Sequence, residues 1–351
     1  IKKDKSFFFF SYEGRTLRAP FVGITDVPSL HARLASPPPL AALLNAFPIP
    51  NGGASPNGPN GFSTFASSYS NPDRLDSAAL RFDDYLTENL AVKARYNFAS
   101  GASDERGSGA YSLNTIRRLR TTMQTLYAGF SHSLSPSVVV EATGNYSRFT
   151  LRNSSRIDDF GGALVPSSAD IFSTIFASTN GASIVNLTGR NAAIANLDDV
   201  LLTQRQVNLV GSLTAISGNH TVKFGADYRR MSPILGVQPL EQSVLFNGIT
   251  QALTGVASRF SNFTRNGPQR PVFNYLSLYG QDSWKINSRM TVTYGLRWDL
   301  NPPPSEENGL AALALNGSAD PAQIGLAPQG TQLWRTTFGN FAPRAGVAYE
   351  V

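Results

Sequence analysis

The stretch LSLYGQDSWKINSRMTVTYGLRWDL, residues 276 to 300, decides the fold, because apolar and polar residues alternate on both sides of the short turn Asn287-Ser288-Arg289. After the turn, one face of an extended strand would carry Met290, Val292, Tyr294, Leu296, Trp298 and Leu300, and the other Thr291, Thr293, Gly295, Arg297 and Asp299. Strands in soluble proteins usually have about 5–6 residues. Two strands of this length need an apolar covering along a whole face.

The same hairpin unit recurs along the chain. Alternating segments pair across short turns at 78–86 with 90–99, 120–133 with 138–150, and 204–216 with 220–231. Long polar loops are predicted between these units, at 14–77, 100–119, 151–203, 232–271 and 301–340. Membrane barrels alternate short periplasmic turns with long extracellular loops in this way.

The pattern predicts an all-β fold, an antiparallel transmembrane β-barrel with long extracellular loops and short periplasmic turns. We count about ten to twelve strands. The count depends on residues 242–265, which read either as a further strand pair or as part of a loop. A large soluble sandwich also has alternating strands, but the strand length argues against it.

Each predicted strand has an apolar face for lipid and a polar face for the lumen. Val138, Val140, Ala142, Gly144 and Tyr146 oppose Glu141, Thr143, Asn145 and Ser147, for example. The charged residues predicted to face the lumen or a plug are Arg81, Asp83, Lys93, Arg95, Glu141, Lys223, Asp227, Arg229, Arg297 and Asp299. The alternative is that these side chains merely solvate the interior of the barrel.

A second set of residues is predicted at the lipid interface, namely Arg148, Arg230, Trp284, Tyr294 and Trp298. Arg148 and Arg230 fall on the apolar face, near the ends of strands that lead out of short turns. They are therefore expected at the extracellular rim, where the phosphates of lipopolysaccharide suit a guanidinium. Snorkelling to water or pairing with a loop carboxylate is the alternative.

The composition excludes several other classes of protein. The net charge of +6 is scattered over 351 residues without a basic block, so no nucleic-acid partner is expected. Cysteine is absent, and no apolar run reaches the roughly 18 residues of a membrane helix. The three histidines, His31, His132 and His220, lack metal-ligand spacing, and no nucleophile stands with its base. We therefore expect no catalytic site, no metal and no cofactor, and hence no enzyme.

Four blocks carry a family resemblance: IKKDKSFFFFSYEG at 1–14, HTVKFGADYRR at 220–230, the opening stretch, and NFAPRAGVAYEV at 340–351. They resemble the barrel of TonB-dependent outer-membrane receptors, most closely the Oar-like group, whose chains begin with a carboxypeptidase-regulatory-like domain. The opening stretch is the most specific block. The resemblance implies a bacterial outer-membrane protein that imports a scarce, bulky ligand, such as a siderophore or an oligosaccharide, powered through the TonB complex.

Barrels of the family that the chain resembles have about 22 strands. Residues 1–351 are therefore expected to be the N-terminal part of such a barrel domain, without the plug, the TonB-contacting N-terminal region and the C-terminal strands. Two alternatives stay open: a passive or adhesive outer-membrane barrel without energised transport, and a soluble β-rich binding protein. The sequence does not identify the ligand.

The face assignment predicts unequal effects of two substitutions on one strand. Val140→Arg places a charge in lipid near the midplane and should cost roughly 2–4 kcal/mol of folding free energy. Thr143→Arg points into the polar lumen and should be much milder. Refolding into lipid vesicles over a denaturant series measures both, and equal costs would contradict the assignment.

Overall fold

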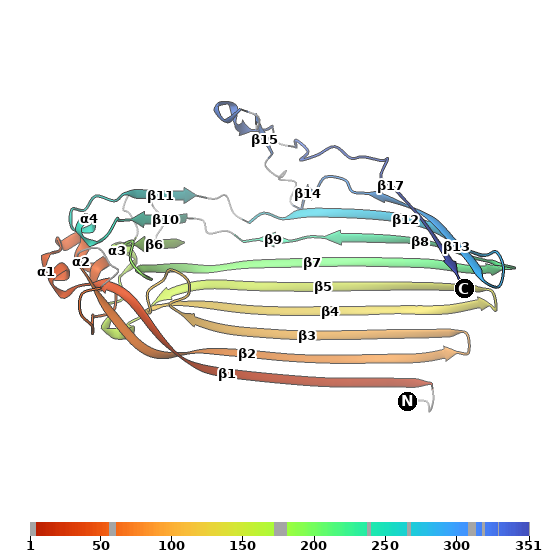
Figure 1. Cartoon of the computed structure of the whole chain (residues 1–351), viewed down its shortest axis with the longest axis horizontal. Helices are drawn as coiled ribbons and strands as arrows, with labels where there is room; N and C mark the ends of the chain where they lie inside the picture. Colours follow the sequence, from red (N-terminus) through yellow and green to blue (C-terminus); the bar gives the residue numbers. More distant parts are fainter. Residues whose placement is uncertain are drawn as a thin grey trace.

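The computed structural model describes residues 5–55, 61–171, 181–236, 240–264, 268–307, 314–317, 320–328 and 330–350. A single antiparallel sheet dominates this part of the chain (Figure 1). Its neighbouring long strands, in order, are β1 (Ser6–Pro28), β2 (Phe62–Thr87), β3 (Leu90–Arg106), β4 (Thr115–Ser135), β5 (Val138–Ile157), β7 (Ala193–Ser217), β8 (His220–Met231), β12 (Pro271–Lys285), β13 (Met290–Leu300) and β17 (Phe341–Tyr349).

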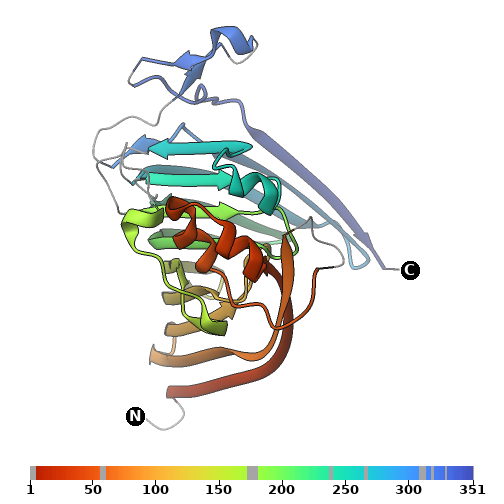
Figure 2. The ribbon, with the colours of Figure 1, turned by 90° about the vertical axis from the view of Figure 1, so that its left-hand side faces the viewer.

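The predicted all-β, antiparallel fold is confirmed, and so are the four hairpins. Leu276 lies opposite Leu300 in the hairpin of the opening stretch, and Val140 lies opposite His132 in the β4–β5 hairpin. The short turns of these hairpins gather at the right-hand end of Figure 1. Viewed along the strands, the sheet curves into an arc that is not closed (Figure 2).

The predicted boundaries of the long loops were wrong. β1 continues to Pro28 and β2 already begins at Phe62, so much of the interval 14–77 is strand. β4 begins at Thr115 and β7 at Ala193, again inside intervals predicted as loops. A membrane strand needs only about 9–11 residues. The extra lengths extend the sheet past the apolar band, where backbone pairing continues although the side chains no longer alternate cleanly.

Small elements gather at the loop end of the sheet, on the left of Figure 1. They are α1 (Leu30–Ala35), α2 (Pro38–Asn45), η1 (Phe160–Gly162), α3 (Ser168–Ile171), α4 (Ile249–Leu253), β6 (Ala182–Asn186), β10 (Leu240–Leu245) and β11 (Arg259–Thr264). We call this assembly the cap. Elsewhere lie β9 (Ile234–Leu235), β14 (Ser305–Glu306), β15 (Leu315–Asn316), η2 (Pro321–Gln323) and β16 (Gly325–Leu326).

The interval 242–265 does contain a strand pair, but within the cap. β10 pairs with β11 antiparallel and with β6 parallel, and α4 lies between β10 and β11 in the chain. Neither strand of the pair exceeds 6 residues. That is too short to cross a membrane, so the long strands of the described sheet number ten, the lower of the two expected counts.

The hydrophobic core of the protein lies in the cap rather than under the sheet. Phe47, Leu44 and Ile249 are almost fully buried there, together with Phe62 and Leu113. The apolar face of the long strands is open by contrast. Phe224 is 58% exposed and Leu209 52% exposed. An apolar face of this extent requires a covering, and lipid supplies one in an outer-membrane barrel.

Arg33 at the end of α1 ties the cap together. Its Nε donates to the carbonyl oxygen of Pro28 at 3.0 Å, Nη1 to that of Phe47 at 3.1 Å and Nη2 to that of Pro48 at 2.6 Å. Burial lowers the pKa of the Arg33 guanidinium to about 10, which still leaves it charged at neutral pH. One side chain thus holds α1 against the segment that follows α2.

Replacing Arg33 should loosen the cap without affecting the barrel. Arg33→Met keeps the apolar stem but leaves three carbonyl groups without a donor, and each unsatisfied buried group costs about 1–3 kcal/mol. Arg33→Lys should recover only part of this loss, because an ammonium cannot copy the planar fork. Hydrogen exchange on the refolded full-length protein should show faster exchange in residues 30–47 and unchanged exchange in β3 and β4. Unchanged protection of the cap would contradict this role.

Candidate functional site

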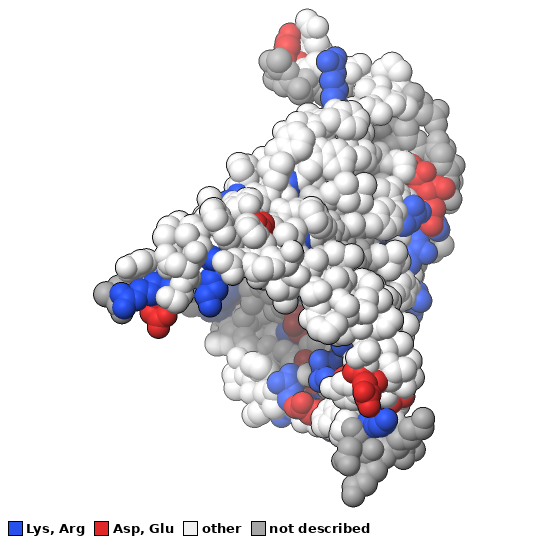
Figure 3. Space-filling model, turned by 90° about the vertical axis from the view of Figure 1, so that its right-hand side faces the viewer, with Lys and Arg blue, Asp and Glu red and all other residues white. Residues whose placement is uncertain are grey.

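The register of the sheet brings all ten residues predicted for the lumen to one face. Side chains of directly opposed residues lie on the same side of a sheet. Asp83 lies opposite Lys93, and Arg81 lies opposite Arg95. Successive pairs of opposed residues on β5, β7, β8, β12 and β13 connect Glu141 to Arg297, so these two side chains lie on the same face. Figure 3 shows charged side chains inside the hollow of the curved sheet. That this face lines a closed lumen or meets a plug stays a prediction.

Arg297 on β13 is the centre of a polar network on this face. Its Nε lies 2.9 Å from Oδ1 of Asp299, and its Nη2 donates to Oγ of Ser277 at 2.7 Å. The Ser277 hydroxyl in turn donates to Asp299 at 2.5 Å. Asp227 on β8 approaches the Arg297 guanidinium to 3.9 Å and accepts a 2.6 Å hydrogen bond from Asn208 on β7. The network therefore joins four strands.

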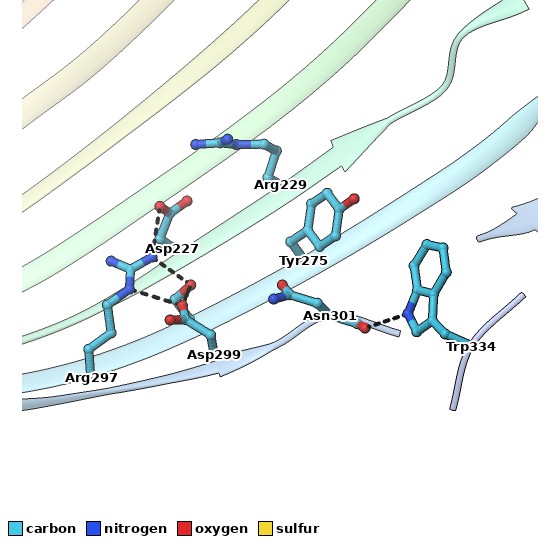
Figure 4. A pocket seen from close by; sticks show the side chains of 8 residues that line it. Asp227, Arg229, Tyr275, Arg297, Asp299, Asn301 and Trp334 are labelled. Atoms are coloured by element: carbon cyan, nitrogen blue, oxygen red, sulfur yellow. Dashed lines mark hydrogen bonds and ion pairs between the residues drawn. The ribbon is translucent and has the colours of Figure 1, made fainter. Parts of the chain in front are cut away.

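A cavity of about 530 Å³ opens beside this network (Figure 4). It is lined by Asp227, Arg229, Tyr275, Ser277, Arg297, Asp299, Asn301 and Trp334. Trp334 comes from the segment before β17, and its indole N–H donates to the carbonyl oxygen of Asn301 at 3.2 Å. Within the described part of the chain, Arg229 has no ion-pair partner. The cavity thus combines a guanidinium free to bind an anion with two aromatic rings.

Four of the predicted residues meet in this cavity, and the other six lie apart from it. Those six make local contacts instead. Arg81 and Asp83 form an ion pair of 2.6 Å, while Lys223 and Glu141 lie 3.9 Å apart. Arg95 donates to Asn97 at 2.9 Å, and Lys93 lies 5.5 Å from the ring centre of Tyr127. These pairs are exposed and each contributes little to stability.

Sequence reasoning missed Tyr275, Ser277, Asn301 and Trp334 as cavity residues. Tyr275 could have been found, because it lies on the polar face and opposite Arg229. Asn301 and Trp334 belong to the segment after β13 and could not be placed by strand periodicity. The prediction treated 301–340 as one loop without assigning any of its side chains.

The predicted interface residues lie on the apolar face. Trp284 stacks on His220 with ring centres 5.4 Å apart, and Tyr294 donates to Asp282 at 2.8 Å. The imidazole Nδ1 of His220 also lies 2.7 Å from this carboxylate. The indole N–H of Trp298 donates to the carbonyl oxygen of Phe338 at 2.7 Å. His220 is therefore packed against Trp284 and hydrogen-bonded to Asp282.

Arg148 and Arg230 are both exposed on the apolar face, toward its loop end. Arg148 lies opposite Gln124 and Arg205, and Arg230 lies opposite Val207. Neither has a carboxylate partner among the described residues, so the alternative of pairing with a loop acid gains no support there. Their position at the membrane interface stays a prediction.

The described residues offer no site for a metal. They contain no group of three or more His, Asp or Glu side chains that could hold an ion. Among the same residues no helix is long and apolar enough to cross a membrane.

The sequence matches a family model described as "Outer membrane beta barrel domain" over residues 35–351. The chain therefore belongs to this family of β-barrels of the bacterial outer membrane. This membership agrees with the expected all-β fold and location, and it places the chain among barrel proteins rather than enzymes. No curated protein matches the sequence.

Solved structures of outer membrane transporters are also similar to the chain. The outer membrane transporter YddB from Escherichia coli is 13% identical with a TM-score of 0.47, over 83% of this chain and 34% of that one. The open form of the ferric-catecholate import receptor Fiu from E. coli K12 is 12% identical with a TM-score of 0.43, over 99% of this chain and 51% of that one. The chain thus spans about half of these proteins or less.

The Arg297 network predicts a measurable coupling between its two closest charges. Arg297→Gln and Asp299→Asn should each destabilise the folded barrel, and the double variant should lose less than the sum. For a partly exposed pair we expect a coupling energy of about 0.5–1 kcal/mol. Arg229→Gln paired with Asp299→Asn is the matched control and should be additive. A coupling of zero for Arg297 with Asp299 would contradict the network.

Proposed function

We propose that the chain is the N-terminal part of the barrel domain of a TonB-dependent, Oar-like receptor that binds and imports a bulky ligand. The observation that carries the proposal is the charged face of the sheet, with a cavity at the Arg297 network, in a barrel of the outer membrane. The plug, the TonB-contacting region and the remaining strands would lie outside residues 1–351.

The polar network suits a barrel wall against which a plug must sit and still move. Arg297 shares its donors among a hydroxyl and two carboxylates, so a change of partner does not leave it uncompensated. Exposed pairs of this kind are weak and exchangeable, unlike a dry ion pair. A movable plug needs contacts that can be broken one at a time.

The cavity residues suit an anionic or polyhydroxylated ligand. Arg229 offers a planar donor set for carboxylate, catecholate or phosphate oxygens. Tyr275 and Trp334 offer aromatic faces for a catechol or a sugar ring. A siderophore or an oligosaccharide fits this chemistry, and the cap provides a folded surface for first contact outside the membrane.

The proposed partners at the membrane are lipid and lipopolysaccharide. Arg148 and Arg230 carry this proposal, since they are exposed and without acidic partners at the loop end of the apolar face. We propose no nucleic-acid partner and no cofactor.

Energised import predicts that uptake needs both the receptor and TonB. Cells with the full-length gene, and cells without it, are given a labelled ferric catecholate and, separately, a labelled maltooligosaccharide. We expect accumulation of one probe only when the receptor and an intact TonB gene are both present, and its loss on adding a proton uncoupler. Arg229→Ala should lower accumulation several-fold, while Arg289→Ala at a short turn should not.

Planar-bilayer conductance of the full-length protein distinguishes a TonB-dependent receptor from a passive barrel. A receptor closed by a plug should show little conductance. A large, stable conductance together with TonB-independent uptake would support a passive barrel and contradict the proposal.

A further inference from the structure

A small polar recess interrupts the apolar face of the sheet near its loop end. Its volume is about 230 Å³, and Thr122 and Gln124 of β4 with Arg148 and Thr150 of β5 line it. Gln124 lies opposite Arg148, and Thr122 lies opposite Thr150. The lining thus offers a guanidinium, an amide and two hydroxyl groups, and it contains no carboxylate. This set of donors suits an anion with several oxygen acceptors.

A second arginine lies next to this recess without lining it, and its charge is paired with Glu307. Arg205 of β7 lies directly opposite Arg148. Like charges in opposed positions destabilise a sheet, and because Glu307 pairs with Arg205, Arg148 is the one of the two without an acidic partner among the described residues. Arg205 reaches Glu307 at 3.2 Å through Nη2, but its Nε is buried without an acceptor among the described residues. Glu307 therefore accepts hydrogen bonds from Nη2 of Arg205 and leaves its Nε without an acceptor among the described residues.

An apolar groove lies on the same face, closer to the short turns. Its volume is about 820 Å³. Small residues form its floor, among them Ala128, Ala142, Gly144 and Gly211, and larger side chains such as Phe130 and Leu209 form its walls. A Cβ atom added at Gly211 would meet no heavy atom within 4 Å, so the floor is open at this position.

The recess and the groove share the strands β4 and β5. At about 3.3 Å per residue, Arg148 in the recess lies about 13 Å along β5 from Gly144 in the groove. Leu126 and Tyr146 are paired between the two sites, and both are exposed. A continuous surface therefore leads from a basic, hydrogen-bonding recess at the extracellular end to an apolar groove at membrane depth.

We propose that the recess and the groove together form a binding site for a phosphorylated, acylated glycolipid of the outer leaflet, lipopolysaccharide. A phosphate group binds to Arg148, Gln124 and the two threonines. One acyl chain passes over Leu126 and Tyr146 and lies in the groove above Gly211. The inference deepens the lipopolysaccharide contact proposed above, and it depends on placing the loop end of the sheet outside the cell.

The test measures lipid binding by the purified full-length protein in mild detergent. The probes are bisphosphorylated lipid A, dephosphorylated lipid A, phosphatidylglycerol and inorganic phosphate, each followed by its effect on the unfolding temperature. We expect a clear rise with bisphosphorylated lipid A, a smaller rise with phosphatidylglycerol, and little change with the other two probes. The first probe alone combines more than one phosphate with several chains.

Two variants separate the headgroup contact from the chain contact. Arg148→Gln should weaken lipid A binding at least about 10-fold, since hydrogen bonds to charged groups are the strong ones. Gly211→Leu should weaken it several-fold by filling the groove, and the Cβ atom of the new side chain meets no heavy atom within 4 Å. Arg289→Gln at a short turn and Leu213→Phe on the same strand outside the groove are the matched controls, and both should bind normally.

Specific outcomes would overturn the site. Equal stabilisation by phosphatidylglycerol and lipid A would assign the surface to phospholipid, and a rise with inorganic phosphate alone would reduce it to a simple anion site. The site would also be contradicted if Arg148→Gln and Gly211→Leu bound lipid A with the same affinity as the two control variants. Ligand uptake measured in parallel keeps the proposals apart, because loss of lipid binding with normal TonB-dependent uptake rejects the lipid site alone.

Discussion

The structure depends on one constraint, that backbone N–H and C=O groups in hydrocarbon must find partners within the protein. The order of the long strands meets this constraint, since each strand between β1 and β17 has a neighbour on both sides. Once the strands are paired, the register fixes which residues share a face, and a slip of one residue would move every side chain to the other face. The charged face, its cavity and the apolar face all follow from that pairing.

The sequence predicted the part of the fold that the membrane constrains. Where one face meets lipid and the other is polar, the alternation is clear, and the two strands on either side of Asn287-Ser288-Arg289 were assigned correctly. Beyond the apolar band the constraint relaxes. The β2 segment around Ser70 to Asp73 reads as a turn-forming loop, yet it is paired with β1 throughout. Backbone hydrogen bonds hold these extensions, and their side-chain pattern carries no period to detect.

The same distinction explains which site residues could be predicted. Residues within strands, such as Asp227 and Arg297, could be assigned to a face from periodicity, and the register confirms that they share one. Periodicity does not say which of ten charged residues meet, because that depends on the stagger between distant strands. Trp334 shows a further limit, since it reaches the cavity from a segment without regular structure. Arg205 lies within the predicted segment 204–216, but it was not among the residues predicted for the lipid interface.

The cap and the long strands are stabilised in different ways, because the cap buries its apolar residues from water whereas the apolar face of the strands meets lipid. In the cap, Phe47 is 0% exposed, so burial from water stabilises the fold in the ordinary way. Along the long strands Phe224 is 58% exposed, and no such gain is available within the protein. There backbone pairing and lipid contact must provide the stability. If the proposed lipid occupies the recess and the groove of this face, it acts on the barrel as core packing acts on the cap, and the outer leaflet then helps to hold the barrel in shape.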